Sequence, residues 1–289
     1  MSLSLKPLHP VFAAQATGLD LNSTLSPEII RAIDDAMNKY AVLVFPGQKL
    51  SGERQMAFAR NFGELDQGLN KMRKTQHRFA YDELIDISNV DVDGSIAARE
   101  SRKVVSNFAN QLWHSDSSFQ RPKAQFSMLH AVVLPNEGGQ TEFADLRNAH
   151  DRLSPALKEE LQDLKAEHWA LYSRFMLGDT HYTPEQQALF EPVIWPLIQT
   201  HPGSGRKLLF VGIHARAIPG WPVSEARMML SDLLEHATLP GYTYRHEWRV
   251  GDLVIWDNRS TVHRGRRFPL AQRRELRRTT INDLHSLTL

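Results

Sequence analysis

Apolar residues along the chain follow two spacings. They recur every three or four positions in four segments, which predicts helices over 27–39, from Ser51 onward, over 154–164 and over 224–236. Alternating or continuous apolar runs predict strands within 3–20 and over 41–45, 84–90, 127–134, 141–145, 166–173, 193–201, 207–212, 242–248, 252–256 and 274–281. Little periodicity is present at 64–83, 94–106 and 174–191, where we expect loops. Two alternatives are open for 94–106, a mobile flap over a site or a solvated surface loop.

Strands outnumber helices in this pattern, and they do not alternate regularly with helices. The order favours an antiparallel β core decorated by helices, and we expect one domain over residues 1–289. A jelly roll is one architecture in which such strands avoid open edges. The fold class that we predict is therefore mainly β with helices.

Composition narrows the class of protein. Hydrophobic residues make up 42% of the chain and charged residues 23%, as in ordinary globular proteins. The formal net charge of +1 gives no overall reason to bind nucleic acid or a membrane. The chain contains no cysteine, which excludes disulfides and thiolate ligands and fits a cytoplasmic location. We expect no signal peptide and no transmembrane helix, because no suitable apolar run is present.

Candidate metal ligands lie in the stretch Trp113-His114-Ser115-Asp116. On a strand, His114 and Asp116 would point to the same face and could bind one ion. His263 is the best candidate for a third ligand from elsewhere in the fold. Two histidines and one carboxylate leave one side of the metal open, which suits non-haem Fe(II). Because the chain has 13 histidines, two polar residues on an ordinary strand are the alternative.

A pair of arginines near the C-terminus forms the second candidate site. Arg274 and Arg278 share a parity with Leu276, so a strand would place all three side chains on one face. Arg273 and Glu275 would then face the other way. Buried guanidiniums need anions, and arginine binds a carboxylate through two parallel hydrogen bonds. The alternative is a basic strand on the surface.

These candidate residues resemble the pattern of a known family. The spacing seen in the taurine dioxygenase family of Fe(II)/2-oxoglutarate oxygenases is matched by His114-x-Asp116, Thr141, Trp256, His263, Arg274 and Arg278. The resemblance extends from Pro7 to about Asp283. Members that act on 2,4-dichlorophenoxyacetate are the most similar over 107–119, 203–207 and 273–278.

The resemblance implies a fold, a set of cofactors and a role for each candidate. The fold would be a double-stranded β-helix, a form of jelly roll, with Fe(II), 2-oxoglutarate and O₂ at its mouth and ascorbate as the reductant. His114, Asp116 and His263 would bind Fe(II). Arg274, helped by the Thr141 hydroxyl, would hold the distal carboxylate of 2-oxoglutarate. Trp256 would lie beside the metal and wall the pocket, with a plain core position as the alternative. Contacts to the primary substrate would come from Arg278 and, with surface positions as the alternative, from Asn110, His214 and Lys71.

The implied reaction is the hydroxylation of an aryloxyacetate such as 2,4-dichlorophenoxyacetate, which gives a phenol, glyoxylate, succinate and CO₂. An alkylsulfonate such as taurine is the alternative substrate within the family. A zinc-dependent hydrolase would use the same three ligands, but it has no evident use for the two paired arginines. A domain that binds nucleic acid through the arginines of 264–278 is disfavoured by the net charge. The expected partner is a small carboxylate, and a homo-oligomer is an open alternative.

Overall fold

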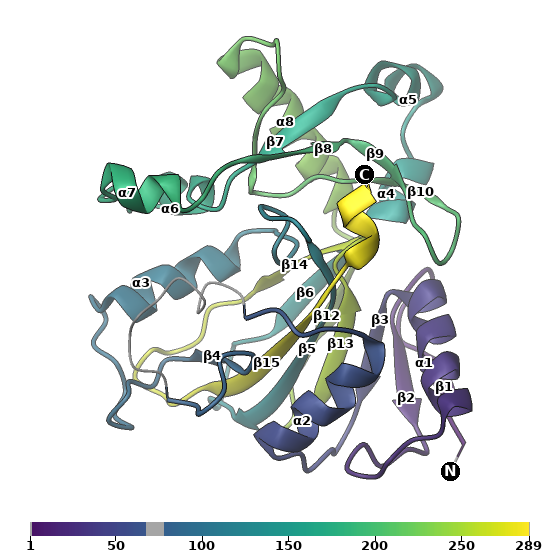
Figure 1. The fold of residues 1–289 in the computed structure, drawn as a ribbon, viewed down its shortest axis with the longest axis vertical. Coiled ribbons are helices and arrows are strands. Elements are labelled where there is room, and N and C mark those ends of the chain that lie inside the picture. Colours follow the sequence, from purple (N-terminus) through teal and green to yellow (C-terminus); the bar gives the residue numbers. More distant parts are fainter. Residues whose placement is uncertain (1, 68–77, 289) are drawn as a thin grey trace.

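Strands outnumber helices in the structure, a computed structural model that describes residues 2–67 and 78–288 (Figure 1). The largest sheet has the order β1-β2-β3-β13-β5-β15-β4, and its neighbours are antiparallel except β2 and β3. Its members are β1 (Ser4–Pro7), β2 (Ala14–Thr17), β3 (Val42–Phe45), β4 (Ile85–Ser88), β5 (Ala124–Val133), β13 (Leu253–Asp257) and β15 (Glu275–Asn282).

A three-stranded sheet packs on the inner face of the large one. Its order is β12-β6-β14, and its strands are β12 (Thr243–His246), β6 (Thr141–Asp145) and β14 (Thr261–Gly265). Alternation along β13 sends Val254 and Trp256 inward, where Phe143 of β6 meets the Trp256 ring at 5.6 Å between centroids. Two facing sheets with a shared apolar layer form the jelly-roll core, so the predicted fold class, mainly β with helices, is confirmed.

Two helices cover the outer face of the large sheet, α1 (Pro27–Tyr40) and α2 (Gly52–Ala59). Pro27 occupies the first turn of α1, and the Ser51 hydroxyl accepts a hydrogen bond from the Arg54 N–H at the start of α2. Ile33 of α1 is fully buried in the cluster that contains Phe45 of β3. Both helices were expected from their apolar spacing, and both are confirmed.

The part of the chain that lies above the two sheets in Figure 1 contains β7 to β10. A third apolar cluster forms around Trp195 and Phe210. Three more strands form a sheet of order β11-β7-β8, and a hairpin joins β9 to β10 as the turn residues at 202–205 predict. The strands here are β7 (Lys165–His168), β8 (Val193–Pro196), β9 (Ile198–Thr200), β10 (Lys207–Leu209) and β11 (Ala215–Ala217). The helices are α4 (Leu146–Asp151), α5 (Pro155–Leu161), α6 (Tyr172–Met176), α7 (Pro184–Ala188) and α8 (Val223–Ala237).

The expectation of only four helices is wrong. Four further helices lie within the described residues, namely α3 (Arg102–Phe108), α4, α6 and α7. Each spans five to seven residues, so none is long enough for apolar residues to repeat at helical spacing. The segment 94–106 is consequently not an irregular loop, because it contains most of α3, which Ser101 caps by accepting from the Val104 N–H. None of the helices in the described ranges is long and apolar enough to cross a membrane.

Candidate active site

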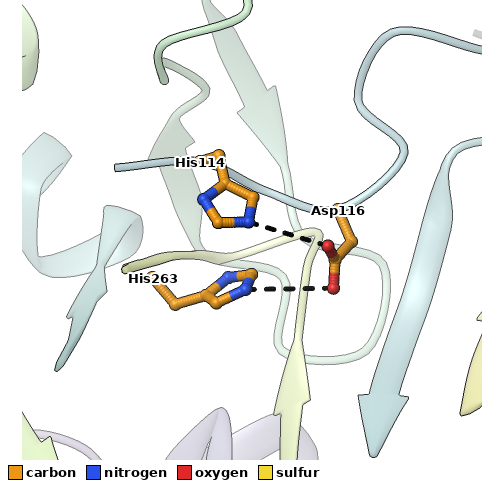
Figure 2. Close-up of side chains that lie close together, drawn as sticks. All are labelled: His114, Asp116 and His263. Atoms are coloured by element: carbon orange, nitrogen blue, oxygen red, sulfur yellow. Dashed lines mark ion pairs between the residues drawn. The ribbon is translucent and has the colours of Figure 1, made fainter. Parts of the chain in front are cut away.

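Backbone pairing brings the first and last candidate ligands together. His114 forms an isolated bridge with His263 of β14, and the two residues exchange N–H···O=C bonds of 3.0 and 2.8 Å. The expectation that His114 and Asp116 share a regular strand is wrong, because Asp116 lies in a turn that continues through Ser117 at φ 54°. The turn nevertheless carries the Asp116 carboxylate to a position beside both imidazoles, with one oxygen facing each ring (Figure 2).

The three side chains form a compact set of donor atoms. His114 Nε2 lies 3.8 Å from Asp116 Oδ1, and His263 Nε2 lies 3.9 Å from Asp116 Oδ2. One ligand atom from each residue lies within 4.8 Å of the others, so one ion can contact all three. All three residues are buried, which protects the donors from solvent. Two imidazoles and one carboxylate form a donor set for a divalent metal with an open side, as in non-haem iron sites.

Hydrogen bonds and burial put these groups in the protonation states that a metal requires. His114 Nδ1 lies 2.7 Å from the Leu112 carbonyl, so a proton there is donated to that oxygen and the Nε2 lone pair stays free. Burial lowers the pKa of both imidazoles, and the neighbouring His114 lowers that of His263 further. Burial alone would raise the pKa of Asp116, but the Arg278 guanidinium and the two imidazoles outweigh it and hold this pKa well below its usual range.

A cavity of about 820 Å³, counting the space that is open to solvent, borders two of the candidate ligands, His114 and His263. Its wall includes seven residues that the sequence singled out: Asn110, His114, Thr141, Trp256, His263, Arg274 and Arg278. The Trp256 ring packs against the His263 ring with 4.6 Å between centroids, so it forms a wall next to the metal ligands.

Arg274 is a buried cation beside this cavity. Only 8% of its surface is exposed, its Nη2 donates to the Gly139 carbonyl at 3.1 Å, and its Nε has no hydrogen-bond partner among the described residues. Burial lowers the pKa of this guanidinium to about 10. The nearby Thr141 hydroxyl accepts from Trp248 Nε1 at 3.0 Å, which leaves its own hydrogen for another acceptor. Together these groups fit the carboxylate of a bound anion.

The predicted parity of the C-terminal arginines is confirmed. Arg274 and Arg278 both line the cavity, whereas Arg273 points away and forms an ion pair with Glu275. Arg278 donates from Nη1 to Asp116 Oδ1 at 2.6 Å, so in this structure the second arginine pairs with a candidate ligand.

Known proteins are similar to this chain over almost its whole length. A family model described as "Taurine catabolism dioxygenase TauD, TfdA family" matches residues 4–280. The chain belongs to this family.

Relatives of this TauD/TfdA dioxygenase share more than half of its residues. The α-ketoglutarate-dependent 2,4-dichlorophenoxyacetate dioxygenase of Burkholderia sp. (strain RASC) is 57% identical over 280 residues, which cover 97% of this chain and 94% of the relative. A protein of the same name from Cupriavidus pinatubonensis is 56% identical over 283 residues and 98% and 99% of the two chains. The crystal structure of AAD-2 in complex with Mn(II) and N-oxalylglycine is similar with a TM-score of 0.90 and 45% identity, covering 96% of this chain and 97% of AAD-2.

Of the three further substrate contacts predicted for this TauD/TfdA dioxygenase, one lies in the cavity wall. Asn110 lines the cavity. His214 is buried behind His114, with 6.1 Å between ring centroids, and it is not among the residues that line the cavity. Lys71 lies outside the described residues. The contributions of His214 and Lys71 to substrate binding therefore stay predictions.

The sequence reasoning missed the wall that α3 contributes. Val104 and Phe108 of α3 line the cavity opposite the strands of the core, together with Ile87 of β4. Asn107 fastens α3 to β4 by donating from Nδ2 to the Ser88 carbonyl at 3.0 Å. The Ser101 cap was the available signal, since a serine three residues before a valine pair is a typical helix start.

Proposed function

We propose that the protein is an Fe(II)- and 2-oxoglutarate-dependent dioxygenase that hydroxylates an aryloxyacetate such as 2,4-dichlorophenoxyacetate. The observation that carries this proposal is the buried Arg274 guanidinium, which lines the same cavity as the two histidines of the two-histidine, one-aspartate donor set. A cation that no described carboxylate pairs with calls for an anionic ligand beside the metal. The names of the two curated relatives, at 57% and 56% identity, support both the cosubstrate and the substrate.

Each cofactor has residues in the cavity that suit it. We propose that His114, Asp116 and His263 hold Fe(II), and that Arg274 and Thr141 hold the distal carboxylate of 2-oxoglutarate. N-oxalylglycine, which accompanies Mn(II) in AAD-2, also carries a carboxylate at each end, which supports this assignment. When bound, Fe(II) and 2-oxoglutarate supply the oxidation: O₂ is reduced, 2-oxoglutarate becomes succinate and CO₂, and one oxygen atom enters a C–H bond.

The remaining groups in the cavity suit an aryloxyacetate. The side chain of Arg278 borders the cavity and is 18% exposed. Once Arg278 has left Asp116, its guanidinium is the cation available to the acetate carboxylate. Ile87, Val104 and Phe108 supply an apolar wall for the aromatic ring. Asn110 is a proposed polar contact at the same wall.

The product chemistry places few further demands on the protein. Hydroxylation of the carbon between the ether oxygen and the carboxylate gives a hemiacetal, which collapses to a phenol and glyoxylate without further catalysis. The chain therefore only has to hold the substrate so that this carbon faces the metal, and to exclude bulk water from it. One catalytic domain over residues 1–289 is part of the proposal, and the family match over 4–280 supports it.

An alkylsulfonate is the second candidate, because the family description names taurine catabolism. Its sulfonate would suit Arg278 equally well, but its short chain would leave the α3 wall without a partner. A zinc hydrolase is disfavoured, since hydrolysis gives no role to the buried Arg274.

A substrate panel tests the proposal. The protein is incubated with Fe(II), ascorbate and 2-oxoglutarate, together with 2,4-dichlorophenoxyacetate or taurine. We expect phenol and succinate in equal amounts from the aryloxyacetate. Sulfite from taurine at a much higher rate than phenol would overturn the substrate assignment and leave the oxygenase class intact.

A further inference from the structure

Buried hydrogen bonds hold Asp116 from two residues that do not line the cavity, Ser127 and Asn258. The Ser127 hydroxyl donates to Asp116 Oδ2 at 2.7 Å, and Asn258 Nδ2 donates to the Ser127 oxygen at 3.0 Å. Asn258 Oδ1 in turn accepts from the Asp116 N–H at 3.0 Å and from Trp256 Nε1 at 2.9 Å. Asn258 therefore holds the Asp116 backbone directly, and its carboxylate through Ser127.

Buried positions in the centre of the large sheet surround this chain of hydrogen bonds. Trp256, Ser127 and Thr280 are cross-strand partners on the three central strands β13, β5 and β15. All three are at most 1% exposed, and so is Asn258. Solvent therefore cannot compete for these bonds, and the sheet fixes where the Ser127 hydroxyl points.

The turn that carries Asn258 is also fixed. Asp257 accepts from the Arg259 N–H at Oδ1 (2.9 Å), and its carbonyl accepts from the Ser260 N–H (3.2 Å) and the Thr261 hydroxyl (2.8 Å). These bonds stabilise the turn that connects β13 to β14. Asn258 is consequently held in place, and it would not move with the Asp116 carboxylate if that group rotated.

The two oxygens of Asp116 are held by contacts of different kinds. Oδ2 is engaged by the Ser127–Asn258 chain, which is anchored in the sheet. Oδ1 is engaged by Arg278, whose long side chain is 18% exposed and borders the cavity. Arg278 can move aside without breaking the core, whereas Ser127 cannot.

We infer that Ser127 and Asn258 are positioning residues for the metal centre. They keep Oδ2 occupied, so that Asp116 offers Oδ1 alone to the metal and the remaining coordination positions stay open for ligands. Arg278 is then released from Oδ1 and becomes free for the substrate anion. The inference rests on the proposed function, because it takes Asp116 to be a metal ligand.

The test measures metal binding rather than turnover. Ser127→Ala removes the hydroxyl that engages Oδ2, and loss of such a supporting hydrogen bond typically weakens metal affinity about 10- to 100-fold. We expect that loss in anaerobic calorimetric titrations with Mn(II), and restoration of most of the affinity in Ser127→Thr, which keeps the hydroxyl. In Co(II)-loaded protein, the visible bands of Ser127→Ala should weaken, because a carboxylate that binds through both oxygens raises the coordination number.

Two comparisons make the result specific. Asn258→Ala should lower the affinity in the same way, and the double variant with Ser127→Ala should lose no more than the worse single variant, since the two residues act in one chain. Ser173→Ala is the matched control, because Ser173 is fully buried but bonds to the Ala170 carbonyl and to the Arg174 side chain instead of to Asp116. It should bind Mn(II) like the wild type.

Unchanged Mn(II) affinity and an unchanged Co(II) spectrum in Ser127→Ala would overturn the inference. So would an equal loss in Ser173→Ala, which would reveal a general effect of a buried cavity. If Ser127→Ala does not fold, Asn258→Ala carries the same comparison. Failure of the proposed function looks different, because the wild-type protein itself would then bind neither the metal nor 2-oxoglutarate.

Discussion

Replacing Arg274 by methionine should affect stability and cosubstrate binding in opposite directions. Arg274 is 8% exposed and has no carboxylate partner among the described residues, so in the ligand-free protein its charge is buried without compensation. Methionine fills similar space without a charge. Arg274→Met should therefore stabilise the ligand-free protein and weaken the binding of 2-oxoglutarate.

Both magnitudes follow from the burial of the guanidinium. Burial lowers its pKa to about 10. At about 1.4 kcal/mol for each tenfold change in proton affinity, the charge costs roughly 3 kcal/mol or less of folding free energy. Removing it should raise Tm by about 2 °C for each kcal/mol recovered in a chain of this size. Loss of a buried, hydrogen-bonded charge pair costs about 2–5 kcal/mol of binding free energy, which is roughly a 30- to several-thousand-fold rise in Kd.

Anaerobic calorimetry with 2-oxoglutarate on the Mn(II)-loaded protein measures the Kd, and thermal unfolding of the ligand-free protein measures Tm. Arg273→Met is the matched control, since Arg273 lies at the next position with a 42% exposed side chain that pairs with Glu275. It should change neither quantity by more than a surface substitution does. Equal rises in Kd for both variants, or a lower Tm for Arg274→Met, would refute the reasoning.

Three further predictions concern the ligands, the pH dependence of stability and the substrate wall. Alanine at His114, Asp116 or His263 should abolish Fe(II) binding and turnover, and zinc should inhibit the wild type; full activity of iron-free, zinc-loaded protein would contradict this. Burial lowers the pKa of Lys123 to about 8 from 10.5. Between these values the unfolded chain holds more protons, so stability from this group rises with pH; denaturant titrations should show Lys123→Met more stable than the wild type at pH 7, by a margin that shrinks towards pH 10. Phe108→Ala should raise KM for an aryloxyacetate about 10- to 100-fold and leave KM for 2-oxoglutarate unchanged, and a parallel rise in both would show that α3 does not bind the ring.

Features with a simple period could be predicted from the sequence. The parity of Arg274 and Arg278 placed both guanidiniums on one face, and both line the cavity. The two-residue repeat of a strand led to that prediction, although Arg274 lies one residue before β15 and the pairing of β15 with β5 shifts its register between Glu275 and Leu276. The apolar run at Val42–Phe45 was recognisable as a buried strand for a different reason, because a short continuous apolar run is typical of a strand that is covered on both faces.

Features that depend on tertiary contacts could not be predicted from the sequence. Asp116 reaches the imidazoles from a turn, and what fixes it there is a hydrogen bond to Asn258, 142 positions along the chain. The short helix α3 is held by contacts such as Asn107 to the Ser88 carbonyl, and no local periodicity predicts them. His214 follows a strand as expected, yet it faces the back of His114 rather than the cavity.

Anaerobic absorption spectroscopy tests the central claim most directly. Fe(II) and 2-oxoglutarate are added separately and then together to the metal-free protein. Our account predicts a weak visible charge-transfer band only when both are present, which is lost in Asp116→Ala and needs far more 2-oxoglutarate in Arg274→Met. A wild-type protein that shows no band with both ligands, or that reaches full activity with zinc in place of iron, would contradict it.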